Sequence, residues 1–335
     1  MLFPRIVKIF SLLAMLCLAA VVAAQDAPAD DTAAPAPVAQ ATETVNEPAV
    51  VQDPFIQSDL SILSGNVQRP NGIFWHNGNL YVSCNGDWTI YEIDAESGST
   101  ATYLWGVRNA HALHVEDDEN GGISLWIPDF QKNELTQIYQ RSTRTIAADL
   151  EGPWGIDTHE EGFLITNLLG NTVAFIDREG NGFEAVQGLR SPAGIVTDGD
   201  AVYVANNGSA RRAIEWFEVD SISEGTPLDA ANGDVQSLIT GLQNPTGLVM
   251  GPDEQLYIAY SLGTRGVIGR VDPQMCRENG GCTNDEVEIV VYTDLAAPLA
   301  GLAISPDMRL FVHTLFSPDI YYADLDDGER TAVRR

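Results

Sequence analysis

RPNGIFWHNGNLYVS, residues 69–83, recurs in outline as SPAGIVTDGDAVYVA at 191–205 and as NPTGLVMGPDEQLYIA at 244–259. After its first residue, each copy has a proline, a variable residue, a glycine and an apolar residue. A polar turn follows, and then a strand of apolar and aromatic residues. The Gly, Asn and Asp residues of the turn suit a tight β-hairpin. A pattern repeated in this way indicates a repeated structural unit.

The anchor glycine of this unit, replaced once by alanine, occurs six times. The anchors are separated by 40, 43, 39, 53 and 54 residues, at Gly72, Ala112, Gly155, Gly194, Gly247 and Gly301. A β-rich strand follows each polar turn, and two further strand-like segments precede the next anchor. Repeats of this length with four strands are typical of β-propeller blades. The sequence therefore predicts an all-β fold, a six-bladed β-propeller of four-stranded blades.

The repeats also predict how the ring closes and where it is enlarged. The sixth repeat lacks a clear fourth strand, and we expect SDLSILSG at 58–65 to supply it, although GERTAVRR at 328–335 competes for that place. The two long intervals place extra residues between the third and fourth strands of adjacent blades, at 220–235 and 272–286.

The residues before the repeats divide into two segments. Residues 1–24 have a charged start, an apolar run and a small-residue end, which predicts a signal peptide. Residues 25–53 are rich in Ala, Pro and Asp and contain no aromatic residue, which predicts a disordered linker. Residues 54–335 form the propeller domain. We therefore expect a secreted or periplasmic protein with no membrane span after the signal is removed.

The cysteines agree with export. Cys276 and Cys282 lie six positions apart in the Gly-rich stretch CRENGGC, and in an exported protein a local disulfide is expected. The alternative is a metal site, which would need a nearby histidine or a second cysteine pair.

The charge of the chain limits its partners. A formal net charge of −29 repels nucleic acids and anionic lipid surfaces at long range. We expect a monomer whose partner is a small molecule or an extracytoplasmic protein.

Over roughly residues 58–335, the repeats resemble the NHL-repeat propellers and the related gluconolactonase-like family. The resemblance rests on the PxGI/L anchors, the LYV-type second strands and the V/I-D ends of the third strands. It implies a divalent cation such as calcium in the central channel, held by carboxylate and Asn oxygens, some of them at the x position of the anchor. No x position is acidic here. Virginiamycin-B-lyase-like propellers also carry an anchor histidine, but they pair it with a second histidine and a glutamate, and no other anchor in this chain has a histidine.

Strand direction places two sets of residues at one end of the channel. The first set occupies the x positions and includes Asn71, His111 and Trp154. The second set follows the second strands and includes Cys84, Asp129, Asn167, Asn206, Tyr260 and Thr314. His111 is the candidate acid or base. Asp129, Asn167 and Asn206 are the candidate cation ligands, and the alternative is that they cap strand ends and satisfy backbone groups.

Basic residues suggest the charge of a ligand. Arg211, Arg212 and Arg265 lie in loops at the same end of the channel, where guanidinium groups would select a small anion. The alternative is that they neutralise neighbouring carboxylates. With Asn71, Trp154 and Tyr260 they form the predicted ligand-binding set. The leading hypothesis is a binding module. The rival is a metal-dependent hydrolase or lactonase with His111 as base, and a lyase is a distant third.

Overall fold

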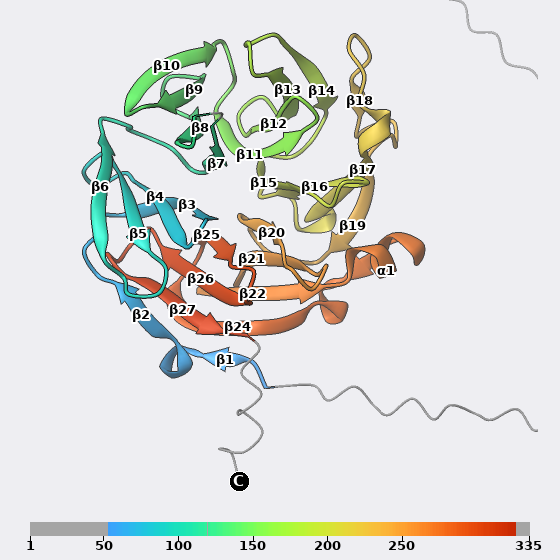
Figure 1. The fold of residues 1–335 in the computed structure, drawn as a ribbon. Helices are drawn as coiled ribbons and strands as arrows, with labels where there is room; N and C mark the ends of the chain where they lie inside the picture. Colours follow the sequence, from blue (N-terminus) through green and yellow to red (C-terminus); the bar gives the residue numbers. More distant parts are fainter. Residues whose placement is uncertain (1–52, 119, 326–335) are drawn as a thin grey trace, which may run out of the picture. The chain divides into compact units, whose positions relative to one another are not determined.

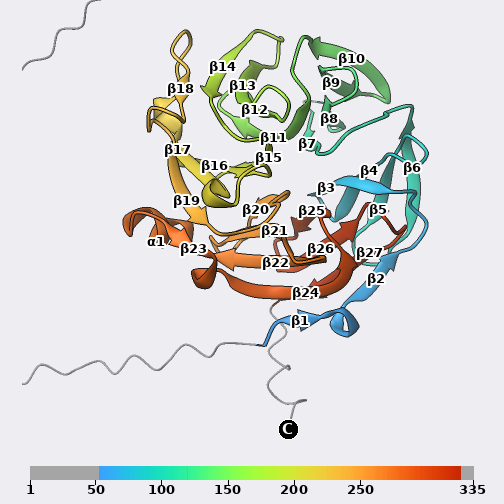
Figure 2. The ribbon, with the colours of Figure 1, turned by 180° about the vertical axis from the view of Figure 1, so that it is seen from behind.

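The computed structural model describes residues 53–118 and 120–325. Within these ranges, six sheets surround a common axis, as Figures 1 and 2 show from opposite sides. The prediction of a six-bladed β-propeller is confirmed. The four strands of each blade are called A to D here, from the axis outward. One short α-helix, α1 (Pro273–Glu278), is present in the described part of the chain, and no helix there is long and apolar enough to cross a membrane.

Blades 1 to 3 follow one another in the chain. Blade 1 consists of β3 (Pro70–His76), β4 (Asn79–Cys84), β5 (Thr89–Asp94) and β6 (Thr100–Trp105). Blade 2 consists of β7 (His114–Asp117), β8 (Ile123–Asp129), β9 (Glu134–Tyr139) and β10 (Ser142–Ala147). Blade 3 consists of β11 (Pro153–His159), β12 (Gly162–Asn167), β13 (Thr172–Asp177) and β14 (Gly182–Gln187).

Blades 4 to 6 complete the ring. Blade 4 consists of β15 (Pro192–Thr197), β16 (Ala201–Asn206), β17 (Ile214–Glu218) and β19 (Gln236–Thr240). Blade 5 consists of β20 (Leu248–Met250), β21 (Leu256–Leu262), β22 (Arg265–Val271) and β24 (Glu288–Ala296). Blade 6 consists of β25 (Leu299–Ile304), β26 (Arg309–Thr314), β27 (Ile320–Asp324) and β2 (Ser61–Ser64).

An N-terminal strand closes the ring. β2 pairs antiparallel with β27, with Ser61 opposite Tyr322, so residues from both ends of the domain share blade 6. The expectation for SDLSILSG is confirmed. The competing C-terminal segment, 328–335, lies outside the described residues, as do residues 1–52, which include the predicted signal peptide and nearly all of the predicted linker.

The enlarged C–D loops of blades 4 and 5 cover the edges of their neighbours. The first contains β18 (Leu228–Asp229), which pairs in parallel with β14 of blade 3. The second contains α1 and β23 (Cys282–Thr283), which pairs with β19 of blade 4. A third short strand, β1 (Phe55–Ile56), pairs with β24 of blade 5. Exposed sheet edges are templates for aggregation, and these fifth strands cover three of them.

Four short 3₁₀-helices occur among the described residues, at Gln57–Asp59, Ala210–Arg212, Val219–Ser221 and Asn284–Glu286. The predicted disulfide between Cys276 and Cys282 is confirmed, and it joins α1 to β23. Cys84 is a buried free thiol.

The anchors of the repeats include places where the backbones of neighbouring A strands approach closely. A Cβ atom on Gly155 would lie 2.3 Å from the carbonyl oxygen of Ala193 in the next blade. A Cβ atom on Gly194 would lie 2.5 Å from the carbonyl oxygen of Thr246. These distances leave no room for a side chain, so the recurring glycine allows the A strands to pack backbone against backbone.

Buried hydroxyl groups form hydrogen bonds across the same contacts between blades. The Thr166 hydroxyl accepts a hydrogen bond from the Gly155 N–H (2.8 Å) and donates one to the Ala193 carbonyl of blade 4 (2.6 Å). The Ser83 hydroxyl in blade 1 accepts from the Gly72 N–H (2.9 Å) and donates to the Ala110 carbonyl (2.9 Å). Each buried hydroxyl therefore links the anchor of its own blade to the backbone of the next.

We expect Gly155→Ala to destabilise the ring, because its methyl group would overlap the Ala193 carbonyl oxygen. Overpacking of this kind costs about 1–3 kcal/mol or more in the free energy of unfolding. Ala112→Gly is the matched control at the one anchor that already carries a methyl group, and it should cost about 1 kcal/mol or less. Urea unfolding of the two variants checks the difference, and equal stability of Gly155→Ala and the wild type would contradict the packing argument.

Candidate functional site

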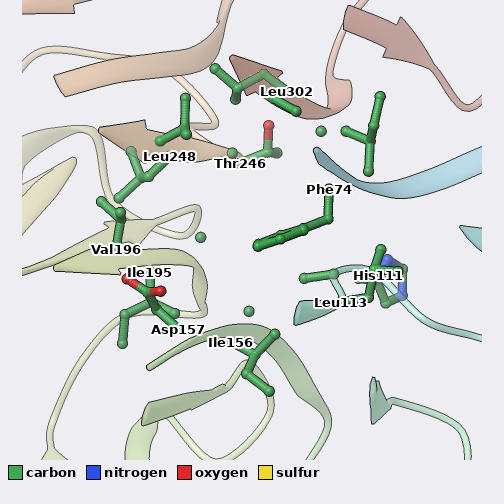
Figure 3. A pocket seen from close by; sticks show the side chains of 18 of the residues that line it. Phe74, His111, Leu113, Ile156, Asp157, Ile195, Val196, Thr246, Leu248 and Leu302 are labelled. Carbon is green, nitrogen blue, oxygen red and sulfur yellow. The ribbon is translucent and has the colours of Figure 1, made fainter. Parts of the chain in front are cut away.

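The A strands of all six blades line a central cavity of about 220 Å³ (Figure 3). The residue after each anchor is apolar, and all six of these residues line the cavity: Ile73, Leu113, Ile156, Ile195, Leu248 and Leu302. The ring of Phe74 projects from β3 toward the middle of the cavity (Figure 3). The lining side chains are therefore mostly apolar, and the few polar ones among them define the chemistry of the cavity.

Three x residues of successive anchors meet at one end of the cavity. The His111 ring stacks on the Trp154 indole, with centroids 3.4 Å apart and an interplanar angle of 11°. The side-chain amide of Asn71 lies within hydrogen-bond distance (3.0 Å) of His111 Nδ1. The edge of Phe130 packs against both rings. The sequence predicted Asn71, His111 and Trp154 at this end, and the structure brings them together; we call them the mouth cluster.

The bulged anchor explains why these side chains meet. In blade 3 the regular pairing of β11 with β12 is interrupted between Pro153 and Ile156, and blade 1 has the same irregularity between Pro70 and Ile73. A bulge re-aims the side chain that it contains. The x residue lies within this bulge.

The environment of His111 keeps its imidazole neutral. Burial lowers the pKa of His111 to about 3. Its Nδ1 is held by an amide and not by a carboxylate, which would have favoured the imidazolium. A base with so low a pKa accepts a proton poorly at neutral pH. The cluster is better suited to stacking and hydrogen bonding than to proton abstraction.

One carboxylate lines the cavity. Asp157, on β11, accepts hydrogen bonds from the backbone N–H of Thr158 (2.9 Å) and of Thr197 in blade 4 (2.7 Å). Burial raises the pKa of Asp157 to about 6. Neither Lys nor Arg is among the residues that line the cavity. This residue did not enter the predicted site, although Asp is the exception at its place in the repeat, two residues after the anchor, where the other blades have Phe, His, Val, Val and Ala.

The oxygens of the predicted cation ligands accept hydrogen bonds from nearby backbone N–H groups. Asp129 Oδ1 accepts from the N–H groups of Gln131 and Lys132, and Asn167 Oδ1 accepts from the N–H of Glu151. Asn206 Oδ1 accepts from the N–H of Arg190, and its Nδ2 donates to the buried Glu215. Residues 53–118 and 120–325 contain no group of three or more His, Cys, Asp or Glu placed to hold a metal ion. The hydrogen bonds of Asp129, Asn167 and Asn206 agree with the alternative that these side chains satisfy backbone groups.

The remaining predicted ligand contacts lie apart from the cavity lining. Arg212 forms an ion pair with Glu215, and Arg265 forms one with Asp294, while Arg211 is exposed. Tyr260 is buried in the hydrophobic cluster between blades 4 and 5. The pairing of two of the three arginines agrees with the alternative that they neutralise neighbouring carboxylates.

Exposed apolar side chains gather in the loops around the mouth cluster. Trp88, Leu169, Leu262 and Phe316 lie in or at the edge of B–C loops, and Trp105 ends the outer strand of blade 1. The guanidinium of Arg108 lies 4.4 Å from the centroid of the Trp88 ring. The B–C and D–A loops therefore form a face with several exposed aromatic groups.

The raised pKa of Asp157 predicts a pH-dependent stability. Because the folded protein disfavours the ionised carboxylate, the contribution of Asp157 is most favourable at low pH and falls as the pH rises from about 4 to about 6. In Asp157→Asn the side chain does not ionise, so the stability of the variant does not fall for this reason as the pH rises. The stability of the variant relative to the wild type should therefore rise by about 2 kcal/mol between about pH 4.5 and about pH 7.5. Urea unfolding at both pH values measures the change, with Glu224→Gln as an exposed control; a constant difference would contradict it.

Comparisons with known proteins agree with the architecture. No protein-family model matches the sequence, and a comparison with curated proteins found no match. Among solved structures, the chain is similar to a gluconolactonase from Xanthomonas campestris (TM-score 0.58, 14% identity, 78% of this chain and 88% of that one). It is also similar to a streptogramin B lyase (TM-score 0.54, 14% identity, 79% and 96%) and to virginiamycin B lyase from Staphylococcus aureus (TM-score 0.51, 16% identity, 76% and 81%). At these identities the likeness shows a shared six-bladed propeller fold.

Proposed function

We propose that this propeller is a binding module that takes a small organic molecule at the mouth cluster and in the cavity below it. The observation that supports this most strongly is the His111 imidazole, stacked on Trp154 and held by Asn71. A neutral ring in this setting offers a flat surface and a hydrogen-bonding nitrogen. An apolar cavity with a few placed polar groups is the usual form of a small-ligand site.

The rival hypothesis, a metal-dependent hydrolase or lactonase, has less support in the described part of the chain. It requires a base and a cation. The pKa of His111 lies far below the working range of a base at neutral pH, and the proposed cation ligands are occupied by backbone groups. The gluconolactonase and lyase names belong to the neighbouring structures and support the fold only.

The loops at the channel end offer less support for an anionic ligand than the sequence suggested. An anion at the rim would have to displace Glu215 from Arg212 and Asp294 from Arg265. Only Arg211 of that set is exposed without a partner in the described residues. We therefore assign the primary contacts to the cavity and its mouth cluster.

A protein partner on the loop face is the second candidate. It is favoured by the exposed Trp105 and Phe316 side chains, which retain 68% and 67% of their accessible surface. Exposed aromatic groups are enriched where proteins bind one another. We further propose export, with residues 1–24 as signal peptide and 25–53 as linker, because the Cys276–Cys282 disulfide suits an oxidising compartment.

The mouth cluster can be tested with two tryptophan variants. A panel of small organic molecules is screened for compounds that raise the melting temperature of the wild type. Trp154→Ala should weaken their binding more than about tenfold, because it removes a stacking surface worth about 1–3 kcal/mol. Trp105→Ala, which removes an exposed indole that does not line the cavity, should leave binding unchanged.

Two results would contradict the proposal. Catalytic hydrolysis of a lactone that requires a stoichiometric bound cation and is abolished by His111→Ala would replace the binding module with the hydrolase. Equal binding of every hit to the wild type and to Trp154→Ala would place the ligand elsewhere.

A further inference from the structure

Asp157 differs from its counterparts in the other blades. The residues at the same place, two after the anchor, are Phe74, His114, Val196, Val249 and Ala303. All of them except His114 line the cavity with Asp157. Figure 3 shows Asp157 on the cavity wall beside Ile195 and Val196, across from the projecting ring of Phe74. A single carboxylate thus faces a cavity whose other lining side chains are mostly apolar.

The contacts of Asp157 leave its charge without a cationic partner. Its two oxygens accept one backbone N–H each, from Thr158 and from Thr197. It forms no ion pair with any described residue, and no Lys or Arg lines the cavity. Each carboxylate oxygen has a further lone pair. The backbone bonds hold the carboxylate in a fixed orientation and still leave it able to accept from a ligand.

Asp157 is only partly exposed, and a carboxylate shielded from water without a cation beside it is costly to ionise. Its burial raises its pKa to about 6, so it is largely ionised at neutral pH in spite of its surroundings. A ligand that brings a positive charge would offset this cost, whereas an anion would add to it. The same carboxylate therefore attracts one class of ligand and repels the other.

From this geometry we propose that the central cavity binds a small organic cation, an amine whose ammonium group pairs with Asp157. This inference rests on the proposed binding function and names the ligand class of the same cavity. The hydrocarbon part of the amine would contact the apolar wall, including Leu248, and the ring of Phe74. A cation beside an aromatic ring gains a further electrostatic attraction from the face of the ring.

The size of the cavity limits the amine. Its volume of about 220 Å³ is below the roughly 300–1,000 Å³ of sites that hold drug-sized ligands. The cavity suits a compact amine with one ring or a short chain. A nucleotide or a folded peptide would not fit within it.

The test compares amines with neutral compounds of the same shape. Isothermal titration of the full chain at about pH 7.5 uses benzylamine and cyclohexylamine, each matched with the corresponding alcohol. The wild type should bind the amines at least about tenfold more tightly than the alcohols, the effect expected of one charge-assisted hydrogen bond. Asp157→Asn should lose this preference while keeping the shape of the side chain. Glu224→Gln removes one exposed negative charge and should keep the preference.

The outcomes separate this inference from the proposed function. Equal affinity of the wild type for amines and alcohols would overturn the cation preference and leave a binding cavity. An amine preference that survives in Asp157→Asn would also overturn it, because the ammonium group would then be held elsewhere. If neither series binds the wild type, the amine site is refuted, and the Trp154 comparison decides separately whether the cavity binds any ligand.

Discussion

The structure depends on the close contact of successive A strands at the repeat glycine. At Gly155 and Gly194, the next blade approaches so closely that a carbonyl oxygen occupies the space a side chain would need. The buried hydroxyls of Ser83 and Thr166, on the second strands of their blades, donate hydrogen bonds to the backbone of the next blade. This packing sets how near the blades come to the axis, and therefore how much space remains in the middle.

The chemistry of the centre follows from this geometry. With the A strands in contact, the residues just after each anchor line a narrow cavity, and most of them are aliphatic. The bulge at the anchor turns Asn71 and Trp154 toward His111, which produces one aromatic and polar cluster at the mouth. Asp157 then lies in surroundings that supply backbone N–H groups but no cation. This combination of shape and electrostatics is the basis on which we propose that the cavity binds a small ligand.

Much of this arrangement could be predicted from sequence because it repeats. The anchors and their spacing predicted six blades, the closing strand SDLSILSG and the long C–D loops, and the spacing within CRENGGC predicted the disulfide. The meeting of Asn71, His111 and Trp154 followed from their shared place in the repeat. The partners of the arginines were harder to predict, because the ion pairs of Arg212 with Glu215 and of Arg265 with Asp294 depend on side-chain conformations that the repeat does not specify. Asp157 was not predicted as a site residue. The alternation of side chains along a strand predicts two faces, but it does not specify which residues of the innermost strand face the channel.

The proposed ligand preference depends on a carboxylate that has no cationic partner in the cavity. The most direct measurement is the pKa of Asp157 in the free protein, from the ¹³C chemical shift of its carboxyl carbon during a pH titration, with Asp157→Asn to assign the signal. We expect a midpoint near 6, well above that of an ordinary aspartate. A midpoint at or below about 4 would contradict it, because the folded protein would then already stabilise the charge.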